Sequence, residues 1–242
     1  MRFAFISDLH GNLHALELVL ADLRREPVDE LVCLGDVASL GPQPREVLAC
    51  LKQLQIPVIM GNHDTYLLNM QLTEKQHPWL RAAEQWCLAQ LSEDDLGFLR
   101  SFKPTLSLAA GPDTTLLCFH GSPRSNEEWL YPTTPSEMLD EIFAEQSAAI
   151  WVGGHTHAQL VRQHRGKLLV NPGSVGMPFE FPMRGPNQRT LPWAEYAVLD
   201  ITDGSINASL RRVPIDFAYL AQVVRASGLP DVEFWLSTWV VD

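Results

Sequence analysis

The stretch RFAFISDLHGN, residues 2–12, contains the pattern that decides the fold. Its apolar run over residues 2–7 combines aromatic and β-branched side chains, which predicts a short buried strand. Asp8 and His10 follow where that strand ends, and Asn12 is a suitable N-cap for a helix over residues 12–25. A strand, a polar pair at its end and a helix are the components of an open α/β sheet.

This alternation continues through the first two thirds of the chain. We expect strands over residues 31–34, 57–60, 114–119 and 149–153. We expect helices between them over residues 45–54 and 136–145. The order of the first elements, strand–helix–strand–helix–strand, implies parallel pairing with right-handed crossovers. Residues 66–100 are polar and predict helix in parts.

The hydrophobic period changes towards β beyond His157. We expect strands over residues 159–164, 167–170, 196–201 and 205–213, with hairpin turns at Gly166 and Asp203-Gly204, and then a helix over residues 216–225. The economical prediction is one domain, residues 1–242, with a mainly parallel half and a mainly antiparallel half.

Composition restricts the class of protein. The chain has 242 residues, of which 46% are hydrophobic, so it can bury most of its unfolded surface without disulfides or a structural metal. Its four cysteines show no Cys-x-x-Cys spacing, and we expect buried thiols. Without a signal-like segment or a membrane-length apolar run, we expect a cytoplasmic protein with no membrane contact. The net charge of −11 argues against nucleic acid as a partner, but not against a small phosphate substrate.

Five polar clusters follow predicted strands. They are Asp8-Leu9-His10, Gly35-Asp36, Gly61-Asn62-His63-Asp64, His120-Gly121 and Gly154-His155-Thr156-His157. Because ligands in open α/β sheets gather at the carboxyl ends of strands, these side chains are expected to converge. Carboxylate, amide and imidazole ligands without thiolate favour Mn, Fe, Zn, Co or Ni over calcium or a soft metal. The pattern predicts a two-metal site for hydrolysis of a phosphate ester.

This ordered set of motifs resembles the calcineurin-like metallophosphoesterase superfamily, from Arg2 to about Ile201. Residues 7–12, Gly35-Asp36 followed by Gly41-Pro42, and residues 171–175 are similar to its small prokaryotic phosphodiesterase-like branch. The resemblance implies a four-layer α/β/β/α sandwich of two mixed sheets flanked by helices, with the metal site at the carboxyl ends of strands. It also implies two divalent transition-metal ions, manganese first, with Fe, Zn, Ni or Co as alternatives.

The resemblance also implies a role for each residue of the motifs. One metal would be held by Asp8, His10 and His157, the second by Asn62, His120 and His155, and Asp36 would bridge them. His63 would contact the developing or departing charge, with Asp64 as a candidate orienting neighbour. The implied reaction is hydrolysis of small-molecule phosphodiesters by in-line attack of a metal-bridging hydroxide.

One position departs from the larger family. Protein phosphatases and dinucleoside tetraphosphatases of this superfamily continue Gly-Asp with an Arg-Gly pair, whereas this chain has Leu40 where that arginine is expected. Leucine cannot replace a bidentate phosphate donor, so those two activities are disfavoured. The difference also leaves His63 without the aspartate partner that this loop supplies in protein phosphatases.

The substrate contacts are less specific in sequence. Gly173 and Ser174 lie in a segment that either presents backbone amides to phosphate or forms a tight turn. Residues 179–183 are aromatic and either line the pocket or pack on the surface. Arg184 and Arg189 are the best candidates for an added phosphate contact. Residues 232–241 either close over the core or form an exposed strip through which a homo-oligomer assembles.

Three functional classes remain open. The phosphodiesterase is favoured, and a phosphomonoesterase is the alternative because the same nucleophile would serve both. A non-catalytic metal-binding scaffold of the same fold would be expected to lose some of these residues. Since all eight expected positions carry suitable residue types, we favour the enzyme.

Overall fold

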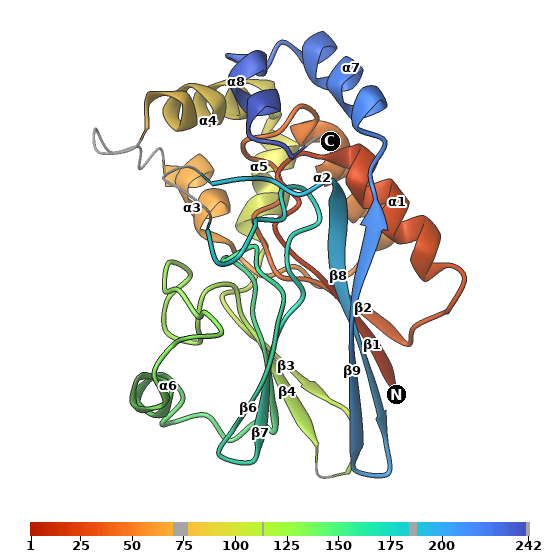
Figure 1. Cartoon of the computed structure of the whole chain (residues 1–242), viewed down its shortest axis with the longest axis vertical. Coiled ribbons are helices and arrows are strands. Elements are labelled where there is room, and N and C mark those ends of the chain that lie inside the picture. Colours follow the sequence, from red (N-terminus) through yellow and green to blue (C-terminus); the bar gives the residue numbers. More distant parts are fainter. Residues whose placement is uncertain (70–76, 113, 184–187, 241–242) are drawn as a thin grey trace.

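Two β-sheets pack face to face, with helices on their outer sides (Figure 1). The computed structural model describes residues 1–69, 77–112, 114–183 and 188–240. The first sheet has the order β2-β1-β8-β9, formed by Glu30–Cys33, Arg2–Ile6, Trp193–Thr202 and Ser205–Pro214. The second has the order β3-β4-β5-β7-β6, formed by Leu106–Ala109, Thr115–Cys118, Ile150–Val152, Lys167–Asn171 and Leu160–His164.

Both sheets are mixed, as the resemblance implies. Strand β1 pairs in parallel with β2 and antiparallel with β8. In the second sheet β4, β5 and β7 are parallel, while β3 and β6 pair antiparallel at the edges. Along the chain, the early strands pair mainly in parallel, β1 with β2 and β4 with β5, and the late hairpins β6–β7 and β8–β9 are antiparallel, so the predicted mainly parallel and mainly antiparallel halves are confirmed in sequence order. In space the two halves are combined. Strand β8 returns from the last third of the chain to pair with β1, so each sheet contains both pairing modes.

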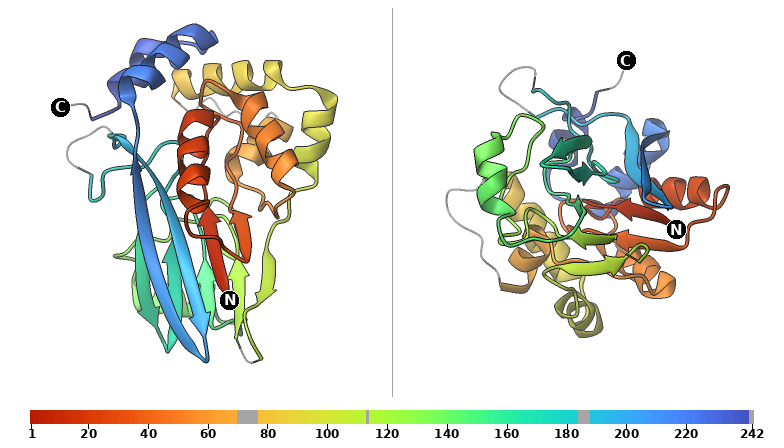
Figure 2. Two further views of the ribbon diagram at one scale, coloured as in Figure 1. Left: turned by 90° about the vertical axis from the view of Figure 1, so that its right-hand side faces the viewer. Right: turned by 90° about the horizontal axis from the view of Figure 1, so that it is seen from below.

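The helices are distributed unequally between the two sheets. Those associated with the first sheet and its upper end are α1 Leu13–Leu23, α2 Pro44–Leu54, α3 Asn62–Asn69, α4 Pro78–Gln90, α5 Glu93–Arg100, α7 Phe217–Ser227 and α8 Val232–Ser237. Figure 2 shows α1 lying against the first sheet. The predicted N-cap is confirmed, because Asn12 Oδ1 accepts a hydrogen bond from the amide of Ala15 at 3.1 Å. Helix α6, Ser136–Ile142, covers the second sheet.

Three hydrophobic layers hold this arrangement. The layer between the sheets includes Phe3 and Phe5 from β1 and Leu116 and Val152 from the facing sheet, all fully buried. A second layer joins the first sheet to its helices, and a third packs α6 on the second sheet. Burial of such side chains contributes roughly 1.5–3 kcal/mol each.

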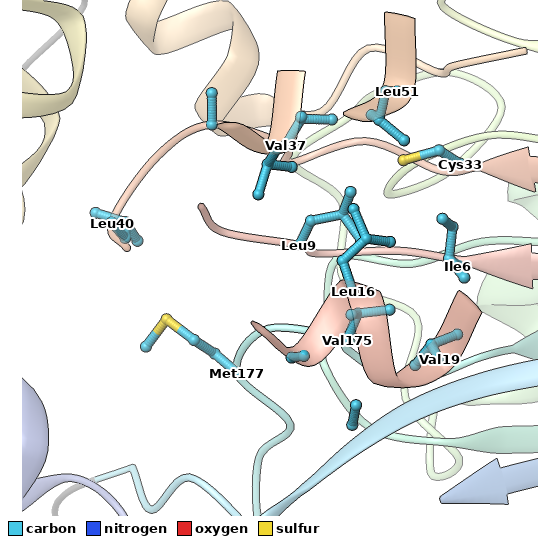
Figure 3. Close-up of a cluster of buried hydrophobic side chains, with 14 of the residues drawn as sticks. Ile6, Leu9, Leu16, Val19, Cys33, Val37, Leu40, Leu51, Val175 and Met177 are labelled. Atoms are coloured by element: carbon cyan, nitrogen blue, oxygen red, sulfur yellow. The ribbon is translucent and has the colours of Figure 1, made fainter. Parts of the chain in front are cut away.

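The second layer extends under the loops that follow the strands. Leu9, Val37 and Val175 come from three such loops and are buried together beside Leu16 of α1 (Figure 3). Each loop therefore has an apolar anchor next to its polar residues. This packing fixes the backbone from which the predicted metal ligands project.

Several predicted elements differ in detail. Residues 57–60 form only isolated bridges, Cys33 with Val58 and Ile59 with Lys103, and not a strand. Pro57 has no N–H to extend that pairing. Strand β3 and helix α8 were not predicted. All four cysteines are free, and Cys50 alone among them is partly exposed.

The end of the described chain packs on the core. Trp235 of α8 is fully buried, and its indole Nε1 donates to the carbonyl oxygen of Leu40 at 3.0 Å. Leu236 and Trp239 are also buried, so the packing alternative holds for residues 232–240. In the described part of the chain, every helix is too short or too polar to cross a membrane.

Candidate metal centre

The predicted ligands converge in two adjoining groups. Asp8, His10, Asp36 and His157 each offer one ligand atom, and these atoms lie within 4.8 Å of one another. Asp36, His120 and His155 form a second group under the same limit. Asp36 belongs to both groups, which is the position of a bridging carboxylate. All six side chains are buried.

Asn62 completes the second group. It begins α3 and is 5% exposed. Its side-chain oxygen lies 3.0 Å from Nε2 of His120. Seven side chains from five loops therefore meet at one site. The loops that carry them lie at the end of the two sheets that faces α4 and α8 (Figure 1).

The strand-end loops turn sharply to aim these side chains. Left-handed backbone conformation occurs at five of the ligands: Asp8, His10, Asp36, His155 and His157, with φ of 54°, 42°, 55°, 67° and 54°. This conformation is uncommon for residues other than glycine and gathers at functional sites. A Cβ atom at Gly61 would lie 2.1 Å from Asp36 Oδ1, so only glycine lets that carboxylate take its position.

Three of the histidines are oriented by backbone carbonyls. His120 Nδ1, His157 Nδ1 and His155 Nε2 donate to the carbonyl oxygens of Leu34, Met177 and Glu127 at 2.7, 2.6 and 3.2 Å, respectively. A ring nitrogen that donates in this way leaves the other nitrogen as an acceptor, which is the usual state of a metal-binding histidine. His10 is held similarly, with Nδ1 3.2 Å from the hydroxyl of Ser39.

The local electrostatics favour ionised carboxylates and divide the imidazoles. Burial acts to lower the pKa of His120, but Asp36 outweighs it and raises that pKa to about 9, whereas the pKa values of His10 and His155 are lowered. Burial lowers the pKa of His10 to about 3, and repulsion from the neighbouring His157 ring adds to this effect. Burial likewise lowers the pKa of His155 to about 4. Burial alone would raise the pKa of Asp8, but attraction to His157 prevails and lowers it to about 2. The pKa of Asp36 is lowered against the same effect of burial, chiefly by His120.

These side chains fit a metal pair. Asp8 Oδ1 and Asp36 Oδ2 are buried and accept no hydrogen bond of good geometry; ring nitrogens of His157 and His120 lie 3.3 Å from them. The Nε2 atoms of His10 and His157 lie only 3.0 Å apart. Buried carboxylate oxygens without hydrogen-bond donors are costly unless a cation satisfies them. Oxygen and imidazole ligands without thiolate suit the transition metals predicted from sequence.

His63 has a carboxylate partner after all. Its Nδ1 lies 2.6 Å from Oε1 of Glu84, a residue of α4 that is 1% exposed. Burial acts to lower the pKa of His63, but Asp36 and Glu84 outweigh it and raise that pKa. The loop that carries Leu40 contains no aspartate to pair with His63, as expected, and a different element supplies a glutamate in its place. The sequence contains one signal for it: Glu84 lies on the apolar face of its helix, between Ala83 and Cys87.

Asp64 does not orient His63. Its carboxylate accepts hydrogen bonds from the backbone amides of Asp36, Val37 and Gly61 at 2.9, 2.9 and 3.0 Å. It therefore braces the loop that carries the shared ligand Asp36. The role predicted for Asp64 belongs to Glu84.

A cavity of about 380 Å³ opens onto the ligands. Leu40 lines it, together with His63 and Phe179. The ring of Phe179 stacks on that of His157, with centroids 4.2 Å apart, whereas Phe181 is 39% exposed. The aromatic segment thus contributes one ring to the cavity and one to the surface.

The other substrate-binding candidates that the structure describes, Gly173, Ser174 and Arg189, are absent from the lining of this cavity. Ser174 Oγ donates to the carbonyl oxygen of Asp8 at 2.8 Å, and the amide of Gly173 donates to Asn171. These contacts agree with the tight-turn alternative. Arg189 does not line the cavity and lies 3.5 Å from Glu180. Arg184 lies outside the described residues.

Comparisons with known proteins show the family and the fold of this chain. Residues 1–204 match the family model of the calcineurin-like phosphoesterase superfamily domain. An uncharacterised protein of Methanocaldococcus jannaschii is 28% identical over 250 residues, which cover 96% of this chain and 94% of that protein. A metallophosphoesterase from Sphaerobacter thermophilus has a crystal structure with a TM-score of 0.74 at 28% identity, covering 98% of both chains. Hypothetical protein PH1004 from Pyrococcus horikoshii shares the fold, with a TM-score of 0.81 at 21% identity and 97% of both chains covered.

Proposed function

Because the chain belongs to the calcineurin-like phosphoesterase superfamily, we propose that it is a binuclear metal-dependent phosphoesterase that hydrolyses small-molecule phosphodiesters. The observation that carries this proposal is Asp36, a buried carboxylate shared by two groups of ligand atoms at the edge of a cavity. A single-metal or purely structural site would not need a shared carboxylate.

The chain's own residues divide the tasks of the reaction. Asp8, His10 and His157 would hold one ion, Asn62, His120 and His155 the other, and Asp36 both. When bound, two such ions neutralise phosphoryl charge and make water nucleophilic near neutral pH. Manganese is the ion we propose first.

His63 is placed to serve the leaving group. Glu84 holds its Nδ1, so the proton on Nδ1 points away from the cavity that His63 lines. The ring can then donate from Nε2 to an oxygen on which negative charge develops. Charge from Asp36 and Glu84 favours the protonated ring that this role requires.

The cavity favours a diester over a monoester. A diester carries a second organic group and one negative charge, whereas a monoester carries up to two. Neither lysine nor arginine occurs among the described residues that line the cavity, so apart from His63 these residues offer no cation to a second phosphate charge. A phosphomonoesterase remains the alternative.

The test compares bis(p-nitrophenyl) phosphate with p-nitrophenyl phosphate, using protein stripped of metal and protein loaded with manganese. We expect a larger kcat/KM for the diester, and activity that requires the metal. Asp36→Asn should reduce kcat/KM for the diester by at least about a hundredfold. That is more than the loss of about tenfold to a hundredfold that is usual when a residue supporting a metal ligand is changed. Asp200→Asn is the matched control, because that carboxylate is exposed on β8 and pairs with Arg2.

Two outcomes would contradict the proposal. A preference for the monoester would establish the phosphomonoesterase instead. Absence of hydrolysis of both esters by protein with two metals bound would favour the non-catalytic scaffold.

We also propose, as in the sequence prediction, that residues 1–242 form one domain in the cytoplasm. The pairing of β8 with β1 joins the two ends of the chain in one sheet. The four free cysteines suit a reducing compartment.

A further inference from the structure

The cavity beside the ligands is walled mainly by aromatic and aliphatic side chains. Helix α4 contributes Trp79 and Leu80, and helix α8 contributes Phe234. Trp129 comes from the loop before α6, and Leu40 from the loop after β2. Five separate segments, including the one with Phe179, thus place apolar groups around one space next to the metal centre.

Two of these aromatic residues are unusually exposed. Trp129 is 45% exposed and Phe234 is 39% exposed, although both line the cavity. Trp129 contacts two other rings, with its centroid 5.6 Å from that of Tyr131 and 4.3 Å from that of His155. Phe234 is held by stacking on His77, with centroids 5.4 Å apart and rings within 9° of parallel. Both rings are thus positioned by neighbours while part of their surface stays uncovered.

The charge of the cavity restricts what can cover that surface. Its described lining contains histidines and Asp36 as ionisable groups, with no lysine or arginine. Apart from its histidines, the described lining offers no charge partner to an additional phosphate, and burying an unpaired charge is costly. A flat, uncharged ring would instead remove apolar surface from water and stack on the exposed aromatic side chains.

We infer that this cavity binds one flat, uncharged aromatic group of a phosphodiester, and that Trp129 and Phe234 determine selectivity for it. The inference rests on the proposed function and names the class of substrate. The ring is an aryl group or a nucleobase. Gln188, Thr190 and Thr238 also line the cavity and would offer polar contacts to the edge of a base.

The kinetic test uses three diesters with the same leaving group, p-nitrophenolate. Their second groups are methyl, p-nitrophenyl and thymidine 5′. We expect kcat/KM to be about tenfold higher for a ring-bearing ester than for the methyl ester, since one stacked ring contributes about 1.4 kcal/mol. Trp129→Ala and Phe234→Ala should each reduce this ratio severalfold. Preference for the thymidine ester over the p-nitrophenyl ester would identify the ring as a base, and the reverse as aryl.

Two control variants accompany the test. Trp129→Phe should retain most of the ratio, because it keeps a ring at the site. Tyr219→Ala removes an aromatic side chain that is 50% exposed on α7 and contacts His14 outside the cavity, so it should leave the ratio unchanged.

A binding measurement separates this inference from the proposed function. Calorimetry with manganese-loaded protein would compare phenylphosphonate with methylphosphonate, neither of which is a hydrolysable ester. We expect about tenfold tighter binding of phenylphosphonate, lost in Trp129→Ala. Equal affinity in the unmodified protein would overturn the inference even if all the diesters are hydrolysed. A phenyl preference without any hydrolysis would uphold it while the proposed function fails.

Discussion

Glu84 is the residue that fixes the orientation of His63. It projects from α4, 21 positions along the chain, and its Oε1 lies 2.6 Å from His63 Nδ1. The place of Glu84 on the apolar face of α4 signals its burial, but nothing in the sequence connects it to His63. The convergence of the predicted metal ligands could be foreseen for the opposite reason: each follows a strand or, for Asn62, an extended segment bridged to one, and strand ends gather at one edge.

Glu84→Gln tests this pair. The amide keeps the size of the side chain but removes its charge, so the protonated ring of His63 loses stabilisation. We expect kcat for bis(p-nitrophenyl) phosphate to fall about tenfold to a hundredfold, with KM changed less. The manganese content should be unchanged, since Glu84 is not among the ligands. Wild-type kcat in a fully loaded variant would show that Glu84 is structural only.

At the scale of elements, local patterns predicted most strands and helices, but not their pairing partners. The hydrophobic period and the turn at Asp203-Gly204 predicted β8 and β9 as a hairpin. Neither feature indicates that β8 lies beside β1, about 190 residues earlier in the chain. Residues 57–60 were predicted as a strand that the structure does not contain. Their apolar run is typical of a strand, but it forms only isolated bridges.

The β8–β9 hairpin contains a buried acid that should make stability depend on pH. Glu195 is 2% exposed, and burial raises its pKa from 4.5 to about 7, although Trp193 and Arg212 donate hydrogen bonds to its Oε1. The folded chain therefore holds this proton more tightly than the unfolded chain between those two pH values. Unfolding free energy should decrease as pH rises from about 4.5 to 7, by at most about 3 kcal/mol.

Urea unfolding at pH 5 and pH 8 measures this contribution. Glu195→Gln cannot ionise, so the variant should lose less stability than the wild type between the two values. Parallel pH profiles for the two proteins would show that Glu195 does not carry this dependence.

At the scale of the whole molecule, the site is a joint product of both sheets and the helical cover. Loops at the ends of the sheets carry the predicted ligands, and the sequence motifs indicated them. Helix α4 supplies Glu84, and α4 and α8 together form much of the cavity wall, which no motif indicated. Helical segments without a ligand motif carry no sequence signal for where they pack. Trp235 ties this cover to the ligand loops, because its indole donates to Leu40.

The central claim is that two ions bound around Asp36 make this chain a phosphoesterase. It is tested most directly by adding manganese stepwise to metal-free protein while following hydrolysis of bis(p-nitrophenyl) phosphate. We predict no turnover without metal and a rise that reaches its plateau only at two ions per chain, with no such plateau in Asp36→Asn. Full activity without metal, or none with two ions bound, would contradict the claim.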